Sequence, residues 1–164
     1  MGDLVIYSKP WDDDALNDQD FAPQLGSAHK IYMGDSRIQN VYYREGSVFC
    51  AQTIFLPVGA PNHSAIQWWE MSPGGFVLQL GRIEDTTAKN FYGFPSLAVG
   101  ASLNMMIGYN RFSATTYPSA YYSYRLDSDG LGFLRPEKLL KAGTGPHYYL
   151  DRKSTRLNSS HLVI

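Results

Sequence analysis

The distribution of hydrophobic and polar positions along the chain predicts short strands separated by turns. Aliphatic and aromatic residues come in short runs, and each run ends at a cluster rich in Gly, Pro, Ser or Asp. Such clusters mark turns and loops. We expect strands at residues 38–44, 48–56, 65–71, 76–83, 94–99, 104–112, 119–126 and 133–140. The pattern therefore predicts an all-β fold.

The predicted strands form two similar groups of four. The order of turns and loops recurs, so that Ser64-Ala65 corresponds to Ser119-Ala120. Four antiparallel strands per repeat are typical of propeller blades, which stack because one sheet cannot bury both of its faces. We predict a partial β-propeller of two blades, residues 36–90 and 91–150, with a β-sandwich as the alternative.

The sequence before the first predicted blade, residues 1–35, is more polar. Residues 4–7 predict one short strand, which ends at Ser8-Lys9-Pro10. Residues 11–36 predict a polar connector, in which the acidic stretch from Asp12 to Asp20 is expected to form a solvated loop.

Six short segments between residues 36 and 149 carry a family resemblance. They are residues 36–49, 68–71, 78–85, 94–99, 117–121 and 141–143. Their order is similar to that in secreted bacterial β-propeller proteins, which are mostly uncharacterised and distantly sialidase-like. The resemblance implies an extracellular or cell-surface setting and no established reaction. It also implies further blades after residue 143, which would pack against the two predicted here.

The last residues have a different character. Residues 151–161 read Asp-Arg-Lys-Ser-Thr-Arg-Leu-Asn-Ser-Ser-His, which resembles the translation of adapter DNA used in short-read sequencing. We therefore expect residues 151–164 to be artefactual and the natural sequence to stop near Leu150, inside a longer propeller. Such segments are left out of reasoning about fold and function.

Charge and composition exclude several classes of protein. Without residues 151–161, 11 Lys and Arg stand against 14 Asp and Glu, a net charge of −3. With no basic cluster, we expect no nucleic-acid partner. No apolar run approaches the roughly 20 residues of a membrane span. Cys50 is the single cysteine and lies in an apolar run, which predicts a buried thiol.

Four residues are candidate ligand contacts. Trp69 and Tyr122 lie on corresponding strands of the two predicted blades, where their rings could stack on a sugar or pack between blades. Arg37 and Arg125 could grip a carboxylate, because a guanidinium offers paired donors in a fixed geometry. For Arg125, a local ion pair with Asp127 is the simpler interpretation.

The known catalytic motifs for acyl transfer, zinc hydrolysis and phosphate binding do not occur in the sequence, and the histidines lack metal-ligand spacing. We therefore predict no cofactor or metal, and a noncatalytic module that binds a glycan or a surface protein. The alternative is a sialidase-like glycoside hydrolase. It requires Arg37 and Arg125 to cluster beside a Tyr or carboxylate, for which Glu70 and Glu84 are candidates.

Overall fold

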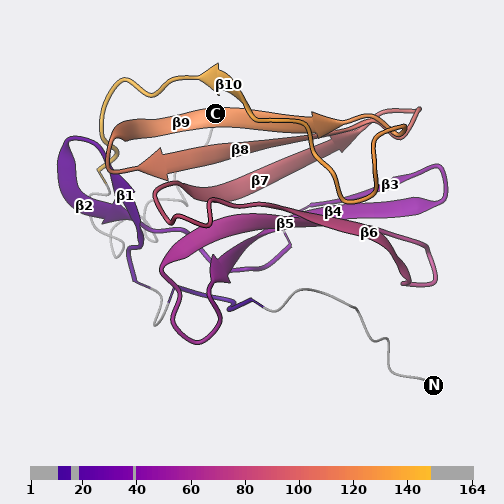
Figure 1. Cartoon of the computed structure of the whole chain (residues 1–164), viewed down its shortest axis with the longest axis horizontal. Coiled ribbons are helices and arrows are strands. Elements are labelled where there is room, and N and C mark those ends of the chain that lie inside the picture. Colours follow the sequence, from indigo (N-terminus) through magenta and orange to yellow (C-terminus); the bar gives the residue numbers. More distant parts are fainter. Residues whose placement is uncertain (1–10, 16–18, 39, 149–164) are drawn as a thin grey trace, which may run out of the picture.

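The computed structural model describes residues 11–15, 19–38 and 40–148, and its strands make an all-β protein, as predicted (Figure 1). The strand predicted at residues 4–7 and the tail at 151–164 lie outside these residues. The strands are β1 (Ala22–Gln24), β2 (Ser27–Ile31), β3 (Val41–Arg44), β4 (Ser47–Leu56), β5 (His63–Met71), β6 (Val77–Ile83), β7 (Phe91–Val99), β8 (Met105–Ser113), β9 (Thr116–Arg125) and β10 (Lys138–Lys141).

Two four-stranded antiparallel sheets form the body of the molecule. The first sheet has the order β3-β4-β5-β6 and the second β10-β9-β8-β7, so strands adjacent in sequence are adjacent in space. Figure 1 shows them as two layers, joined by the connection from β6 to β7. The first sheet ends with β6 at Ile83, and the second begins with β7 at Phe91. A closed propeller ring stays a prediction.

Local turn chemistry explains the first hairpin. Glu45 and Gly46, between β3 and β4, both have positive φ angles, 47° and 80°. Two such residues in a row are typical of a type I′ turn, whose twist matches that of the flanking strands. The predicted turn at this position is thus confirmed, and it sets the pairing of Val41 with Cys50.

The hydrophobic core lies between the two sheets. Phe49 and Trp68 project from the first sheet and contact Leu97 and Ile107 of the second. Trp68 has an exposed fraction of 0%. In β7 and β8 buried residues alternate with more exposed ones, as expected for strands with one face on a core.

The connector predicted at residues 11–36 is wrong in one respect, because it contains the hairpin β1–β2. The hairpin and its flanks bury Phe21, Ile31 and Met33 against Phe55 and Phe112 at one end of the sheets. Its strands are short and one side is polar. An isolated two-stranded hairpin is marginal in water, so these tertiary contacts, which no local pattern reveals, stabilise it.

The last predicted strand is also different in the structure. Only Lys138–Lys141 pairs with β9, whereas residues 127–137 form a loop that returns toward the first sheet. In this loop the Gly132 N–H donates a hydrogen bond to the Gln79 side chain of β6, at 3.0 Å. The loop therefore joins the edges of the two sheets.

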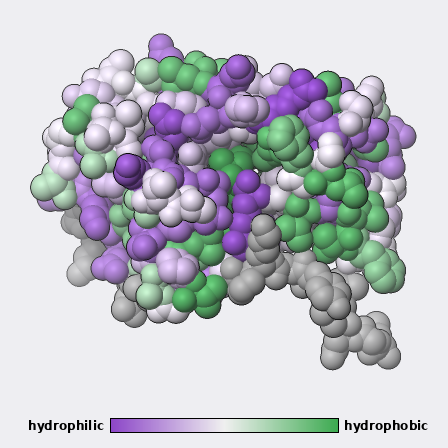
Figure 2. Space-filling view, viewed as in Figure 1, coloured by the Kyte–Doolittle hydropathy of each residue, from purple (hydrophilic) through white to green (hydrophobic). Residues whose placement is uncertain are grey.

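The first sheet carries apolar residues on the face away from the core as well. Tyr43, Val48 and Met71 share this face through their pairing, as do Val41, Cys50 and Trp69. In Figure 2, hydrophobic surface gathers over the side where β3 and β6 lie. Cys50 is buried, and burial raises the pKa of its thiol to about 11, so the predicted buried thiol is confirmed and is unreactive.

Candidate functional site

An open pocket lies at one end of the second sheet, beside the β1–β2 hairpin. Its volume is about 330 Å³, within the range of small-ligand sites. It is lined by Ile31, Tyr32, Phe94, Asn110, Phe112, Pro118 and His147. We call this hollow the Phe94 pocket. It brings together β2, three strands of the second sheet and the segment after β10.

Phe94 is held in an unusual backbone conformation. Its φ angle is 55°, in the left-handed region, and it lies in an irregular stretch of β7 between Gly93 and Ser96. Its N–H donates a hydrogen bond to the Thr53 hydroxyl at 3.2 Å, and 37% of the residue remains exposed. Such a conformation costs on the order of 1–3 kcal/mol for a non-glycine residue and is found preferentially at functional sites. The irregularity aims an aromatic ring at the pocket, a common role of β-bulges.

The lining of the Phe94 pocket is largely aromatic and contains no Asp, Glu, Lys or Arg. The Phe94 and Phe112 rings meet edge to face, with centroids 6.2 Å apart and planes at 77°. The Asn110 amide makes no hydrogen bond within the described part of the chain, so it is available to a ligand. This combination suits a neutral ligand with one apolar face and several hydroxyl or amide groups.

The wall that carries His147 is fixed to the β1–β2 hairpin. Gln24 donates a hydrogen bond to the His147 carbonyl at 2.8 Å, and its own side-chain oxygen accepts one from the His147 N–H at 2.6 Å. Nearer to β10, the same segment is tied to β9, because the Gly143 N–H donates a hydrogen bond to the Ser119 hydroxyl at 2.9 Å. The pocket is therefore bounded by backbone that is tied at both ends.

A second hollow lies on the same sheet, beside the opposite end of β9. Its volume is about 430 Å³, and it is lined by Tyr124, Asp129, Phe133, Arg135, Pro136 and Lys138. The Arg135 guanidinium lies over the Tyr124 ring, 5.4 Å from its centroid, and forms an ion pair with Asp129 at 2.9 Å. Hydrogen bonds from Arg135 hold the pKa of Asp129 at about 2. We call this hollow the Tyr124 pocket.

Tyr122 lies between the two pockets. It pairs with Gly108 of β8, and Gly108 alternates with the buried residues Ile107 and Tyr109. Tyr122 is therefore on the face of the second sheet away from the core, which we call the outer face. The sequence-predicted ring at this position is partly exposed and faces outward.

The other predicted aromatic contact has a different environment. Trp69 is on the outer side of the first sheet, with an exposed fraction of 4%. Its ring packs against Trp11, with centroids 5.8 Å apart and planes at 65°. Trp69 thus packs against Trp11 and not between the two sheets, and little of its ring is open to a ligand.

The two predicted arginines are not brought together. Arg37 has a side chain that is 87% exposed and forms an ion pair with Asp35 at 2.6 Å. Arg125 is 1% exposed, and its guanidinium donates to the Asp129 carbonyl at 3.1 Å, not to Asp127. One guanidinium faces solvent and the other is buried, so they share no anion site.

The two candidate carboxylates are likewise held separately. Glu70 is buried between the sheets and accepts hydrogen bonds from Ser47 and Gln79. Glu84 lies 3.3 Å from the His63 ring nitrogen. Each carboxylate has its own structural partner, and neither is placed in the Phe94 or the Tyr124 pocket.

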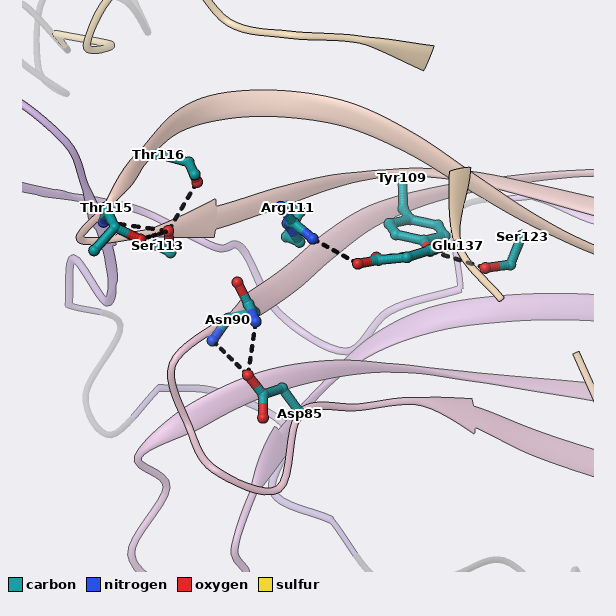
Figure 3. Close-up of polar contacts among 9 residues, drawn as sticks. All are labelled: Asp85, Asn90, Tyr109, Arg111, Ser113, Thr115, Thr116, Ser123 and Glu137. Carbon is teal, nitrogen blue, oxygen red and sulfur yellow. Dashed lines mark hydrogen bonds and ion pairs between the residues drawn. The ribbon is translucent and has the colours of Figure 1, made fainter. Parts of the chain in front are cut away.

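A polar cluster on the core side of the second sheet was not predicted. Arg111 forms an ion pair with Glu137, and Tyr109 donates to Glu137 at 3.3 Å and meets Ser123 at 2.9 Å (Figure 3). The Arg111 guanidinium also lies 4.0 Å from the centroid of the Tyr121 ring. Burial raises the pKa of Tyr109, so its hydroxyl stays neutral near neutral pH. We interpret the cluster as a structural network that ties β10 to the sheet.

Asp85 fixes the connection between the two sheets (Figure 3). Its carboxylate accepts hydrogen bonds from the Thr87 hydroxyl at 2.6 Å and N–H at 2.9 Å, and from the Asn90 amide at 2.7 Å and N–H at 3.0 Å. These bonds, the one from the Thr87 hydroxyl above all, lower the pKa of Asp85 from 3.8 to about 2. The ionised form is thus favoured by folding.

We expect Asp85 to make stability depend on pH in the acid range. Because its folded pKa lies below its unfolded one, its contribution is present above pH 3.8 and is lost as the pH falls toward about 2. Asp85→Asn should therefore unfold more easily at pH 7 and lose less stability on acidification. Urea unfolding at pH 7, 4 and 2.5 checks this. Asp127→Asn, at an exposed carboxylate, should unfold like wild type at pH 7. An Asp85→Asn variant that lost as much stability on acidification as wild type would contradict the assignment.

Metal and membrane signatures are also absent from the described residues. Within them, no three His, Cys, Asp or Glu gather in a group able to hold a metal ion. Nor does this part of the chain contain a helix of the length and apolarity that crossing a membrane requires.

Comparison with known proteins gave no matching family model, no matching curated protein and no matching solved structure. The resemblance to secreted β-propeller proteins therefore stays a prediction from the sequence. The candidate site rests on its own geometry.

Proposed function

We propose that the chain is a noncatalytic module that binds a glycan, and that the Phe94 pocket holds one of its sugar rings. The observation that carries the proposal is a strained Phe94 backbone that turns an aromatic ring into an open pocket whose lining has no Asp, Glu, Lys or Arg. A sugar ring has an apolar C–H face, which an aromatic ring can cover, and hydroxyl groups around its edge. The Asn110 amide can both donate to and accept from such hydroxyls.

We also propose that the two sheets are neighbouring blades of a partial propeller in a secreted or surface protein, with a further blade of the same polypeptide packed on the apolar outer side of the first sheet and the outer face of the second sheet left open. Two features support this arrangement. The sheets are consecutive four-stranded meanders that pack face to face, and the first sheet is apolar on its other face too, around Cys50 and Trp69. The extracellular setting rests on the family resemblance alone.

Hydrolysis of a sialylated substrate is not part of the proposal. It would require several guanidinium groups around one carboxylate. Arg37 pairs with Asp35 in solvent, and Arg125 is buried against the Asp129 carbonyl. The Phe94 pocket, which the geometry favours, contains no Lys or Arg to pair with the carboxylate of an acidic sugar, so it suits neutral sugars better.

Phe94→Gly tests the proposal, because it removes the ring and relieves the backbone strain at once. We expect binding of the full chain on an array of neutral and acidic glycans to fall by about tenfold or more, the effect of losing a central contact. Stability should change by less than about 1 kcal/mol, since loss of a partly exposed ring is offset by release of strain.

Ala88→Gly is the matched control, because Ala88 has the same φ angle of 55° but lies in the β6–β7 connection. It should leave glycan binding unchanged. A folded wild-type protein that binds no glycan on the array, or a Phe94→Gly variant that binds as well as wild type, would contradict the proposal.

A further inference from the structure

We infer that the bound glycan is a neutral chain of several sugar rings, laid along the outer face of the second sheet from the Phe94 pocket past Tyr122 to the Tyr124 pocket. The inference rests on the proposed function and extends it from one sugar ring to a chain. What carries it is the position of Tyr122 and Gly108 between two separate hollows on one face.

The two pockets are joined by a continuous strand face. Asn110 lines the Phe94 pocket, and Met106, the partner of Tyr124, lies four residues earlier in β8. At about 3.4 Å per residue, the two positions are roughly 13 to 14 Å apart along the strand. A single sugar ring cannot span that length, whereas a short chain of linked rings can.

The floor between the pockets includes several small residues beside Tyr122 and Met106. Gly108 pairs with Ser96 on one side and with Tyr122 on the other, and Ala98 and Ala120 occupy neighbouring positions of the same face. A Cβ atom at Gly108 would meet no atom closer than 3.9 Å. Packing within the sheet therefore does not require glycine there. The absence of a side chain at Gly108 leaves space above the strand, beside the Tyr122 ring.

The aromatic rings are spaced along this floor. Tyr122 and Tyr124 are two residues apart on β9, so both lie on the outer face, and both are partly exposed. Together with Phe94 they offer a series of ring surfaces at intervals along β8 and β9. Amphipathic tyrosine rings suit ligands that alternate apolar faces with hydroxyl edges.

The charges at the two ends differ. The Phe94 pocket contains no Asp, Glu, Lys or Arg, whereas the Tyr124 pocket includes Lys138 and the Arg135–Asp129 ion pair. A bound glycan would thus place a neutral end sugar against Phe94, and its hydroxyl groups would lie against the charged donors and acceptors near Tyr124. Proline-rich peptides also bind aromatic grooves. The hydroxyl-rich glycan fits better, because hydrogen-bonding side chains are present at both ends.

The test is the dependence of affinity on chain length. Calorimetry would compare glucose, galactose and mannose with their neutral oligosaccharides of two to four rings, on wild type, Tyr122→Ala and Gly108→Val. We expect wild-type affinity to rise by about tenfold or more from one ring to four. Tyr122→Ala and Gly108→Val should lose that gain and keep the affinity for single sugars. Valine suits a strand, so Gly108→Val should stay folded.

Tyr42→Ala, an exposed tyrosine on β3 of the other sheet, is the control and should behave as wild type. A folded wild type that binds one ring as tightly as four would overturn the inference and leave the proposed function standing. Failure to bind any sugar of any length would overturn both. Binding of a proline-rich peptide across Tyr122 in the absence of sugar binding would replace the glycan as the ligand.

Discussion

Trp68→Ala is expected to lower the free energy of unfolding by about 3 to 5 kcal/mol, the usual cost of removing a fully buried large aromatic side chain. Trp68 is 0% exposed and contacts residues of both sheets in the central core. Its loss leaves a cavity at the interface on which the packing of the sheets depends. Urea unfolding followed by circular dichroism measures the change.

Two further variants make this result interpretable. Trp68→Phe keeps most of the apolar volume and should cost clearly less. Tyr42→Ala, on the exposed edge strand β3, should stay within about 0.5 kcal/mol of wild type. If Trp68→Ala were as stable as Tyr42→Ala, the two sheets could not be packed on each other as described.

Gly81→Ala is expected to have the second largest effect, a loss of about 1 to 3 kcal/mol from overpacking. A Cβ atom at this position would lie 2.5 Å from the Gly132 carbonyl oxygen and 2.6 Å from the Trp68 indole nitrogen. Both neighbours are fixed, the first as backbone and the second by burial in the core. The loop 127–137 would have to move away from β6.

Gly130→Ala is the matched control. Gly130 lies in the loop 127–137, which contacts Gly81 through Gly132, but a Cβ added at Gly130 meets nothing within 4 Å. Gly130→Ala should unfold like wild type. Thermal unfolding of the two variants side by side makes the comparison. Equal midpoints would show that β6 and this loop do not approach each other closely.

The parts of the fold that were predicted correctly depend on local chemistry. The β3–β4 hairpin follows from Glu45-Gly46 between two β-rich runs, and β8 from a largely apolar run between two turn segments. The β1–β2 hairpin and the short β10 could not be predicted in the same way. These strands form through contacts with residues distant in sequence. One such contact is the hydrogen bond from the Leu25 N–H to the Thr116 carbonyl.

The candidate site was predictable only in part, for a similar reason. Tyr122 was identified because it is an aromatic residue on a strand with one outward face. Phe94 was missed because neither its left-handed backbone nor the irregularity of β7 has a sequence signature. Trp69 was ambiguous because β4 and β5 are buried on both faces, which makes an aromatic platform and a packed ring look alike.

The most direct test of the central claim is a backbone amide NMR titration of the chain with a neutral tetrasaccharide. We expect the largest shift changes at Tyr32, Phe94, Asn110 and Tyr122, which line the Phe94 pocket or the outer face beside it. Changes confined to the first sheet around Trp69, with the outer face of the second sheet unaffected, would contradict the claim.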